Sequence, residues 1–301
     1  MWRVIDVGGS GYFLHTHHNS LIIEKDGSKT EVPFQDIHSI ICHGVGFRYS
    51  DAFFKACLHN KIPVTFCDET HLPLGMLLPM YQHTDAAKRM EAQLQASLPR
   101  KKQAWQQIIK AKLHFQGDLL ESLGLSNGAR RLFVLAKNVL SGDPTNNEAQ
   151  GAKIYFEALM GTTFFRSDQT NAINAKLDYG YSILRSAVAR AVVDVGLLPS
   201  QGVFHSNRIN PFCLIDDLME PYRPMVDSLV LSIGAKYGIE PTLIPDEKRL
   251  LMNLTAATVT TGENKMELTN ALRIYVMSYL NFLTREQNAI EFPTPEYAWT
   301  I

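Results

Sequence analysis

The chain has 301 residues, of which 46% are hydrophobic and 20% are charged. This length and composition predict one large or two ordinary globular domains, and they exclude a disordered chain, a collagen and a small disulfide-stabilised scaffold. The 29 Lys and Arg residues and the 30 Asp and Glu residues give a net charge of −1. A nucleic-acid surface would therefore have to be local, because the whole chain has no cationic field.

The cysteines and the hydropathy pattern bear on the compartment. Cys42, Cys57, Cys67 and Cys213 form no CxxC pair, which favours free thiols in a reducing compartment over a zinc site. Asp6 interrupts the first apolar run, unlike the apolar core of a signal peptide. No apolar stretch approaches the roughly 18 residues that span a membrane. We therefore expect a soluble, cytoplasmic protein with no membrane contact.

The first 80 residues have the pattern of a β-rich unit. Short apolar runs predict strands over 2–7, 12–16, 21–25, 30–34, 37–42 and 64–67. Asp26 and Gly27 are a hairpin turn signal between two of them. Phe53, Phe54 and Cys57 recur at helical spacing and predict one helix over 50–60, with Ser50 as its N-cap.

Helical periodicity dominates from residue 85 onward, and strand patterns nearly vanish. The predicted helices cover 85–97, 100–122, 128–140, 146–160, 170–196, 211–220, 224–237, 246–257 and 264–286. We place a linker at about 79–86. The expected fold is α+β with two domains, a small β-rich N-terminal domain over residues 1–80 and an all-α domain over residues 81–301.

One segment is distinctly basic. Residues 86–131 hold nine Lys and Arg residues against three acidic residues, a local charge of +6. A solvated helix face explains such a run, and so does a phosphate-binding surface.

Three residues from separate segments carry metal-ligand chemistry. Glu148 lies in the first turn of a predicted helix, His205 follows the longest predicted helix, and Glu220 ends another. Two carboxylates and one imidazole suit Mg²⁺ or Mn²⁺, which can polarise a phosphodiester. An acid at a helix N-terminus and a turn at Pro221 explain the same residues structurally. The spacing alone leaves both interpretations open.

Four short motifs lie in order between residues 148 and 224. They are Glu148-x-x-x-Ala152-x-x-Tyr155-Phe156, Asn174-x-x-Leu177-x-Tyr179-Gly180-Tyr181-x-x-Leu184, Gly202-x-x-His205 and Leu214-x-x-Asp217-Leu-x-Glu220-x-x-Arg223-Pro224. In this combination the chain resembles the universal CRISPR-associated integrase of spacer acquisition, in the shorter form of type II systems. The order of a β-rich part before a helical part extends the resemblance over essentially the whole chain.

The resemblance implies a fold, a site and an activity. The N-terminal domain would form a homodimer, and the helical domain would be catalytic, with Mg²⁺ or Mn²⁺ held by Glu148, His205 and Glu220. The protein would be a metal-dependent DNA endonuclease and integrase that inserts fragments of foreign double-stranded DNA into a CRISPR array by attack of a 3′-hydroxyl. Two dimers would be bridged by a dimer of the smaller CRISPR adaptation protein, as a heterohexamer.

Other residues become candidates in this light. We expect DNA phosphate contacts among the basic residues Lys101, Lys102, Arg130, Arg131, Arg166 and Arg223. Asn174 and Asp217 are expected either to support the metal ligands or to face DNA. Two alternatives stay open: a metal-dependent nuclease that acts on branched DNA in repair or recombination, and a non-catalytic assembly subunit whose acids and His205 form structural ion pairs.

Overall fold

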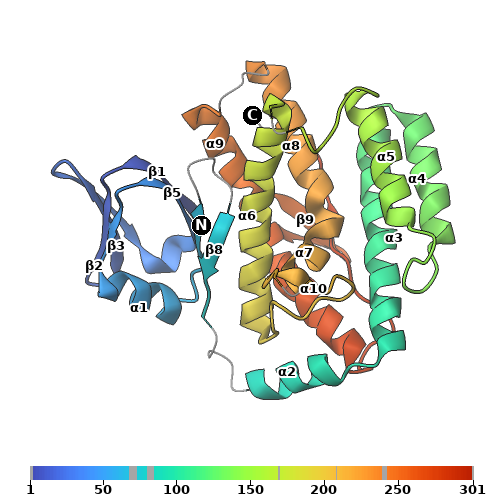
Figure 1. Cartoon of the computed structure of the whole chain (residues 1–301), viewed down its shortest axis with the longest axis horizontal. Helices are drawn as coiled ribbons and strands as arrows, with labels where there is room; N and C mark the ends of the chain where they lie inside the picture. Colours follow the sequence, from blue (N-terminus) through green and yellow to red (C-terminus); the bar gives the residue numbers. More distant parts are fainter. Residues whose placement is uncertain are drawn as a thin grey trace.

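The computed structural model describes residues 3–67, 73–79, 85–168, 170–207, 209–238 and 243–299. In Figure 1 a β-rich part with one helix lies beside a larger helical part. Residues 80–84 of the predicted linker, and Trp2 of the first predicted strand, lie outside the described residues. The chain is α+β, as expected.

Two sheets build the N-terminal part. In the first, the order is β1 (Arg3–Ser10), β5 (Ile37–Val45), β7 (Val64–Cys67) and β8 (Pro73–Leu77), with only β8 antiparallel to its neighbour. In the second, the order is β4 (Ser28–Pro33), β3 (Ser20–Lys25), β2 (Phe13–His17) and β6 (Arg48–Tyr49). The sequence analysis missed the strands β6 and β8.

The local signals in this part are confirmed. Asp26 and Gly27 form the two-residue loop that joins β3 to β4, both with positive φ, as a type I′ hairpin turn requires. The Ser50 hydroxyl accepts a hydrogen bond of 3.1 Å from the Phe53 N–H and caps α1 (Asp51–His59). Apolar side chains from both sheets and α1 form one hydrophobic cluster.

Nine helices account for most of the larger part among the described residues. They are α2 (Ala86–Gln95), α3 (Leu98–Ser122), α4 (Ser126–Asn138), α5 (Asn147–Met160), α6 (Ala172–Val195), α7 (Cys213–Met219), α8 (Arg223–Tyr237), α9 (Pro245–Met252) and α10 (Leu268–Leu283). Short 3₁₀ turns occupy Phe34–Asp36, Glu220–Tyr222 and Asn253–Ala256. None of these described helices is long and apolar enough to cross a membrane.

Helix α6 runs through the middle of the molecule, with the N-terminal part on one side and α3, α4 and α5 on the other (Figure 1). Most of its side chains are buried all around the helix, as expected for a helix inside a core. The Arg190 guanidinium donates to the carbonyls of Ile37 and His38, and the Thr65 and Ser186 hydroxyls are 2.7 Å apart. Helix α6 therefore joins the two parts, and their division into domains at residue 80 stays a prediction.

A small sheet corrects the prediction that residues 81–301 are all helical. Its strand order is β10 (Asn264–Glu267), β9 (Thr258–Thr261) and β11 (Thr294–Pro295). The helix predicted over 264–286 begins only at Leu268. The β-branched run Thr258–Thr261 favours a strand, and the two-residue loop Gly262–Glu263 turns it back on β10. The apolar periodicity of α10 hid this hairpin.

Helices α3 and α5 approach each other closely at Gly151. A Cβ atom at this position would lie 2.1 Å from Leu113 Cδ2 of α3. Gly151→Val should therefore lower the free energy of unfolding by about 1–3 kcal/mol, because overpacking forces the two helices apart. Chemical denaturation measures the effect. The matched control is Gly75→Val, where a Cβ meets nothing within 4 Å; equal stability of the two variants would contradict this packing.

Candidate active site

Two of the predicted metal ligands meet at a buried lysine. Glu148 lies in the first turn of α5, and Glu220 lies in the 3₁₀ turn between α7 and α8. The Lys112 ammonium on α3 lies 2.9 Å from Glu148 Oε1 and 2.6 Å from Glu220 Oε2. The structure thus brings together two carboxylates that are far apart in sequence, and it places a cation between them.

The start of α5 is fixed by side chains that bind its free N–H groups. Asp143 Oδ1 accepts a bond of 2.9 Å from the Asn147 N–H, and Asp143 Oδ2 accepts one of 2.9 Å from the Glu148 N–H. Asn146 accepts from the Ala149 N–H at 3.2 Å as the N-cap. These caps satisfy donors that the helix leaves unpaired, and they hold the Glu148 backbone in place.

His205 lies in the connection from α6 to α7 and is oriented by Asp217. The His205 Nδ1 atom is 2.5 Å from Asp217 Oδ1, and the N–H groups of Phe204 and His205 both donate to Asp217 Oδ2. Asp217 is fully buried, whereas half of the His205 side chain is exposed. A Cβ at Gly202 would lie 2.2 Å from the His205 carbonyl oxygen, which explains the glycine of the Gly202-x-x-His205 motif.

An aromatic stack supports the same loop. The Phe204 ring stacks on Trp105 of α3 with centroids 4.8 Å apart, and the His205 ring meets the edge of Trp105 at 5.4 Å. Trp105 is buried and Phe204 is half exposed. Because Nδ1 of His205 is held by Asp217, the ring presents its Nε2 atom away from the carboxylate.

The backbone at Glu220 differs from what Pro221 indicates. Residue 220 has φ −51° and ψ −44°, in the right-handed helical region that a following proline disfavours. Helix α7 does end just before it, at Met219, and Pro221 occupies the first turn of the next segment, where its missing N–H costs nothing. Glu220 Oε1 accepts from Arg223 Nε at 2.7 Å.

The charges of these groups depend on one another. Burial alone would raise the pKa of Glu220, but Arg223 and Lys112 lower it to about 2. Burial opposes the charge of Lys112, yet Glu220 and Glu148 raise the pKa of its ammonium. The hydrogen bond to Asp217 raises the pKa of His205, and the charges of Glu148 and Glu220 act in the same direction. His205 therefore lies within electrostatic reach of both carboxylates.

A cleft of about 450 Å³ opens beside His205 and Glu220. Three arginines line it: Arg166, Arg185 and Arg223. Arg166 bonds Asn174 and Asp178, and Arg185 makes a two-pronged pair with Asp216 at 2.7 and 2.8 Å. Arginines of this kind bind phosphate groups well.

The other predicted DNA contacts lie elsewhere. Lys101 and Lys102 lie near the start of α3, and Arg130 and Arg131 are exposed on α4. None of these four lines the cleft. Asn174 is buried, and its amide donates to the carbonyls of Phe165 and Asp168 at 2.8 Å, so it holds the turn that carries Arg166.

Sequence reasoning missed several residues at this site, including Trp105, Arg185 and Asp227. It counted Lys112 only in the basic segment 86–131, as part of a solvated helix face or a phosphate-binding surface, whereas the structure buries Lys112. Asp227 of α8 is buried and accepts hydrogen bonds from the Tyr155 and Tyr181 hydroxyls at 2.7 and 2.5 Å, so it ties α5, α6 and α8 together. The sequence did contain a signal that Lys112 is buried. It lies four positions after Ile108 and three before Phe115, on the apolar face of α3.

The donor chemistry of the site fits a divalent cation. Two carboxylates and an imidazole whose far nitrogen is held by a buried acid are the oxygen and nitrogen donors that such ions take. Within the described residues, however, no three His, Cys, Asp or Glu side chains stand in a metal-holding arrangement. The positive charge between Glu148 and Glu220 is the Lys112 ammonium.

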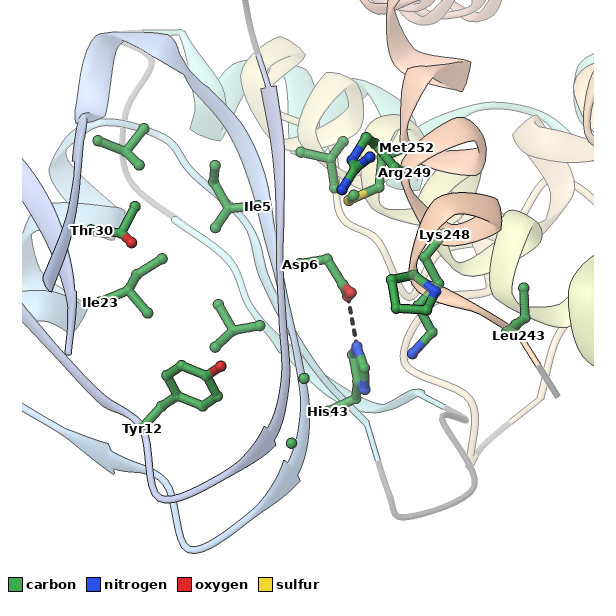
Figure 2. Close-up of a pocket in the computed structure, with 16 residues that line it drawn as sticks. Ile5, Asp6, Tyr12, Ile23, Thr30, His43, Leu243, Lys248, Arg249 and Met252 are labelled. Atoms are coloured by element: carbon green, nitrogen blue, oxygen red, sulfur yellow. Dashed lines mark ion pairs between the residues drawn. The ribbon is translucent and has the colours of Figure 1, made fainter. Parts of the chain in front are cut away.

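A larger cavity of about 600 Å³ lies between β1 and α9 (Figure 2). Asp6 and His43 form an ion pair of 2.8 Å at its wall, and Lys248 faces them from α9. This cavity is lined by none of the predicted site residues. It lacks a carboxylate pair with an imidazole, so the smaller cleft is the candidate active site.

The family model of CRISPR associated protein Cas1 matches residues 6–259. The chain belongs to the Cas1 family. A CRISPR-associated endonuclease Cas1 of Neisseria meningitidis serogroup C (strain 8013) is 35% identical over 295 residues, which are 98% of this chain and 96% of the relative. The family that the four motifs indicated is thus confirmed, and the matched range contains all three predicted ligands.

Solved structures share the fold. A casposase bound to integration product matches with a TM-score of 0.83 at 20% identity, over 99% of this chain and 96% of that one. A chain of a Cas6-RT-Cas1–Cas2 complex matches with a TM-score of 0.76 at 20% identity, over 96% of this chain and 35% of that chain. At this identity the matches show that the fold is shared.

The buried Asp227 predicts a pH dependence of stability. Burial raises the pKa of this carboxyl to about 6, although the two tyrosine hydroxyls oppose the shift. The folded protein then holds a proton that the unfolded chain has lost, so stability from this group is present below about pH 4 and is lost as the pH rises to about 6. Asp227→Asn removes this change.

Thermal unfolding of both proteins between pH 4 and pH 7 measures it. The melting temperature of the wild type relative to Asp227→Asn should fall between pH 4 and pH 6 and then level off. The other titrating groups are common to both proteins and cancel in the difference. A difference that stays constant with pH would contradict the raised pKa.

Proposed function

We propose that this Cas1-family chain is a metal-dependent DNA endonuclease and integrase that inserts foreign DNA fragments into a CRISPR array. One observation carries the proposal: a charge-balanced pair of carboxylates, Glu148 and Glu220, lies beside an imidazole oriented by Asp217, at an arginine-lined cleft. The names of the relatives, an endonuclease and a casposase with an integration product, support the same chemistry.

Glu148, His205 and Glu220 would hold Mg²⁺ or Mn²⁺, which supplies neutralisation of the charge that develops on the phosphoryl oxygens. Asp217 fixes the ring of His205, and the caps of α5 fix Glu148, so both groups are positioned before substrate arrives. Arg166, Arg185 and Arg223 bind the DNA phosphates on either side of the reacting one. The 3′-hydroxyl of the incoming DNA attacks a phosphodiester of the array. A bond forms between its oxygen and the phosphorus, and the bond to the 3′-oxygen of the array strand breaks, so that strand leaves with a 3′-hydroxyl.

The proposal extends to partners. We propose that the array and the fragment are both double-stranded DNA. The protein would act on them in the cytoplasm. We propose a homodimer formed through the N-terminal part, and two dimers bridged by the smaller adaptation protein in a heterohexamer. A Cas6-RT-Cas1–Cas2 complex among the structures of the same fold supports such a partner.

His205→Ala, Glu148→Gln and Glu220→Gln should each lower strand transfer at least about 100-fold, because each weakens the hold on the metal that would stabilise charge on the reacting phosphate. The assay uses a labelled branched DNA that mimics a half-integrated product, with and without Mn²⁺. The matched control is His114→Ala, an exposed histidine on α3 that contacts Phe133.

Each outcome separates the alternatives. Metal-dependent rejoining that is lost in the variants and kept in the control supports the integrase. Cleavage without rejoining, also after addition of the small partner protein, favours a general nuclease for branched DNA. Unchanged strand transfer in folded His205→Ala and Glu148→Gln would contradict the site.

Arg166→Ala should weaken DNA binding about 3–30-fold and reduce the steepness of its salt dependence by about one unit, because one phosphate contact is lost. Fluorescence anisotropy at several salt concentrations measures both quantities. Arg249→Ala is the control, because Arg249 is an exposed arginine that lines the other cavity. Equal salt slopes for the wild type and Arg166→Ala would remove Arg166 from the DNA surface.

A further inference from the structure

Lys112 is an unusual residue for the interior of a helical core. Its side chain is only 7% exposed, and it lies on the face of α3 that carries Ile108 and Phe115. A lysine is almost never buried unless it is paired. Here the ammonium has two anionic partners from two other segments, Glu148 of α5 and Glu220 before α8.

The same oxygens are the ones a metal would need. The Lys112 ammonium pairs with Oε1 of Glu148 and with Oε2 of Glu220, while Arg223 donates a hydrogen bond to Oε1 of Glu220. An ammonium at 2.6–2.9 Å from these oxygens fills the space between the carboxylates. A Mg²⁺ ion binds oxygen at about 2.0–2.1 Å, so the ammonium and the ion cannot occupy this space together.

We propose that Lys112 is a built-in counter-cation of the site, which neutralises the carboxylate pair while no divalent ion is bound and must move away when one binds. The inference rests on the proposed function and deepens it, because it concerns how the same site acquires its metal. The Lys112 ammonium and a divalent ion would repel each other strongly if both lay between the two carboxylates, because the site is largely buried. The wild-type protein therefore binds a divalent cation more weakly than its donor set alone would allow.

The arrangement has two measurable consequences of opposite sign. Without the ammonium, Glu148 loses its cation and Glu220 keeps only Arg223 as a charged partner. The two carboxylates then repel each other, and the metal-free protein loses stability. A divalent ion would bind this protein without Lys112 more tightly than it binds the wild type, because the ammonium no longer competes with the ion for the two carboxylates. A residue with a merely structural role would show the first consequence and not the second.

The test compares the wild type with Lys112→Met, which keeps the length of the side chain and removes its charge. Isothermal titration with Mn²⁺ alone gives the dissociation constant, and thermal unfolding with and without Mn²⁺ gives the stability. We expect Lys112→Met to bind Mn²⁺ at least about tenfold more tightly. Without metal, Lys112→Met should also melt at a lower temperature than the wild type. Added Mn²⁺ should raise its melting temperature by more than it raises that of the wild type.

Lys176→Met is the matched control. Lys176 is also a buried lysine, paired with the buried Glu247 at 2.5 Å on α9. This variant should lose stability too, but its Mn²⁺ affinity should equal that of the wild type, and Mn²⁺ should not restore its melting temperature. If metal-free Lys112→Met does not fold, Lys112→Gln replaces it, because the amide can still donate a hydrogen bond to a carboxylate.

The outcomes distinguish this inference from the proposed function. Equal Mn²⁺ affinity of the wild type and the Lys112 variant, or weaker binding by the variant, overturns the role of Lys112 and leaves the proposed metal site standing. Absence of Mn²⁺ binding in the wild type and in both Lys112 variants overturns the metal site and the inference together.

Discussion

Two carboxylates that meet at the edge of a helical core repel each other unless positive charge lies between them, and the site of this Cas1-family chain is organised around that constraint. Glu148 and Glu220 approach one another because Lys112 pairs with both. Removing one partner of such a group leaves an uncompensated buried charge. The same three side chains link α3 to α5 and to the turn before α8, next to the close approach of α3 and α5 at Gly151.

A second layer of buried polar groups holds the elements that carry the site. Asp217 orients His205, Asp143 caps α5, and Asp227 receives two tyrosine hydroxyls from α5 and α6. Each of these acids is buried, and both of its carboxylate oxygens have hydrogen-bond partners. A network with its hydrogen bonds satisfied fixes one arrangement of the helices, which is what a site needs when its groups come from separate segments.

The sequence predicted most helices because their apolar residues recur at helical spacing. Ser50 and Asp26–Gly27 show that capping and turn residues can also be recognised in the sequence. It failed at Asn264–Glu267, where β10 runs directly into α10 and the apolar period of the helix extends backward over the strand. Long-range pairing explains the other gap. The residues Glu148, His205 and Glu220 were named from their chemistry and from family motifs, but no pattern indicated that Lys112 would meet two of them.

Under the proposed function, the cleft is the surface that a chain with a net charge of −1 would offer to DNA. Each of the three described arginines that line it is already paired with an acid, Arg166 with Asp178, Arg185 with Asp216 and Arg223 with Glu220. The acids cancel the field of the arginines at a distance, so free DNA is not drawn in by long-range attraction. In the proposed complex, a phosphate would take the place of the partly exposed carboxylate of Asp178 or Asp216 on the same guanidinium. DNA binding of this kind would be an exchange of one anion for another, which would favour DNA that fits the cleft over DNA that is merely charged.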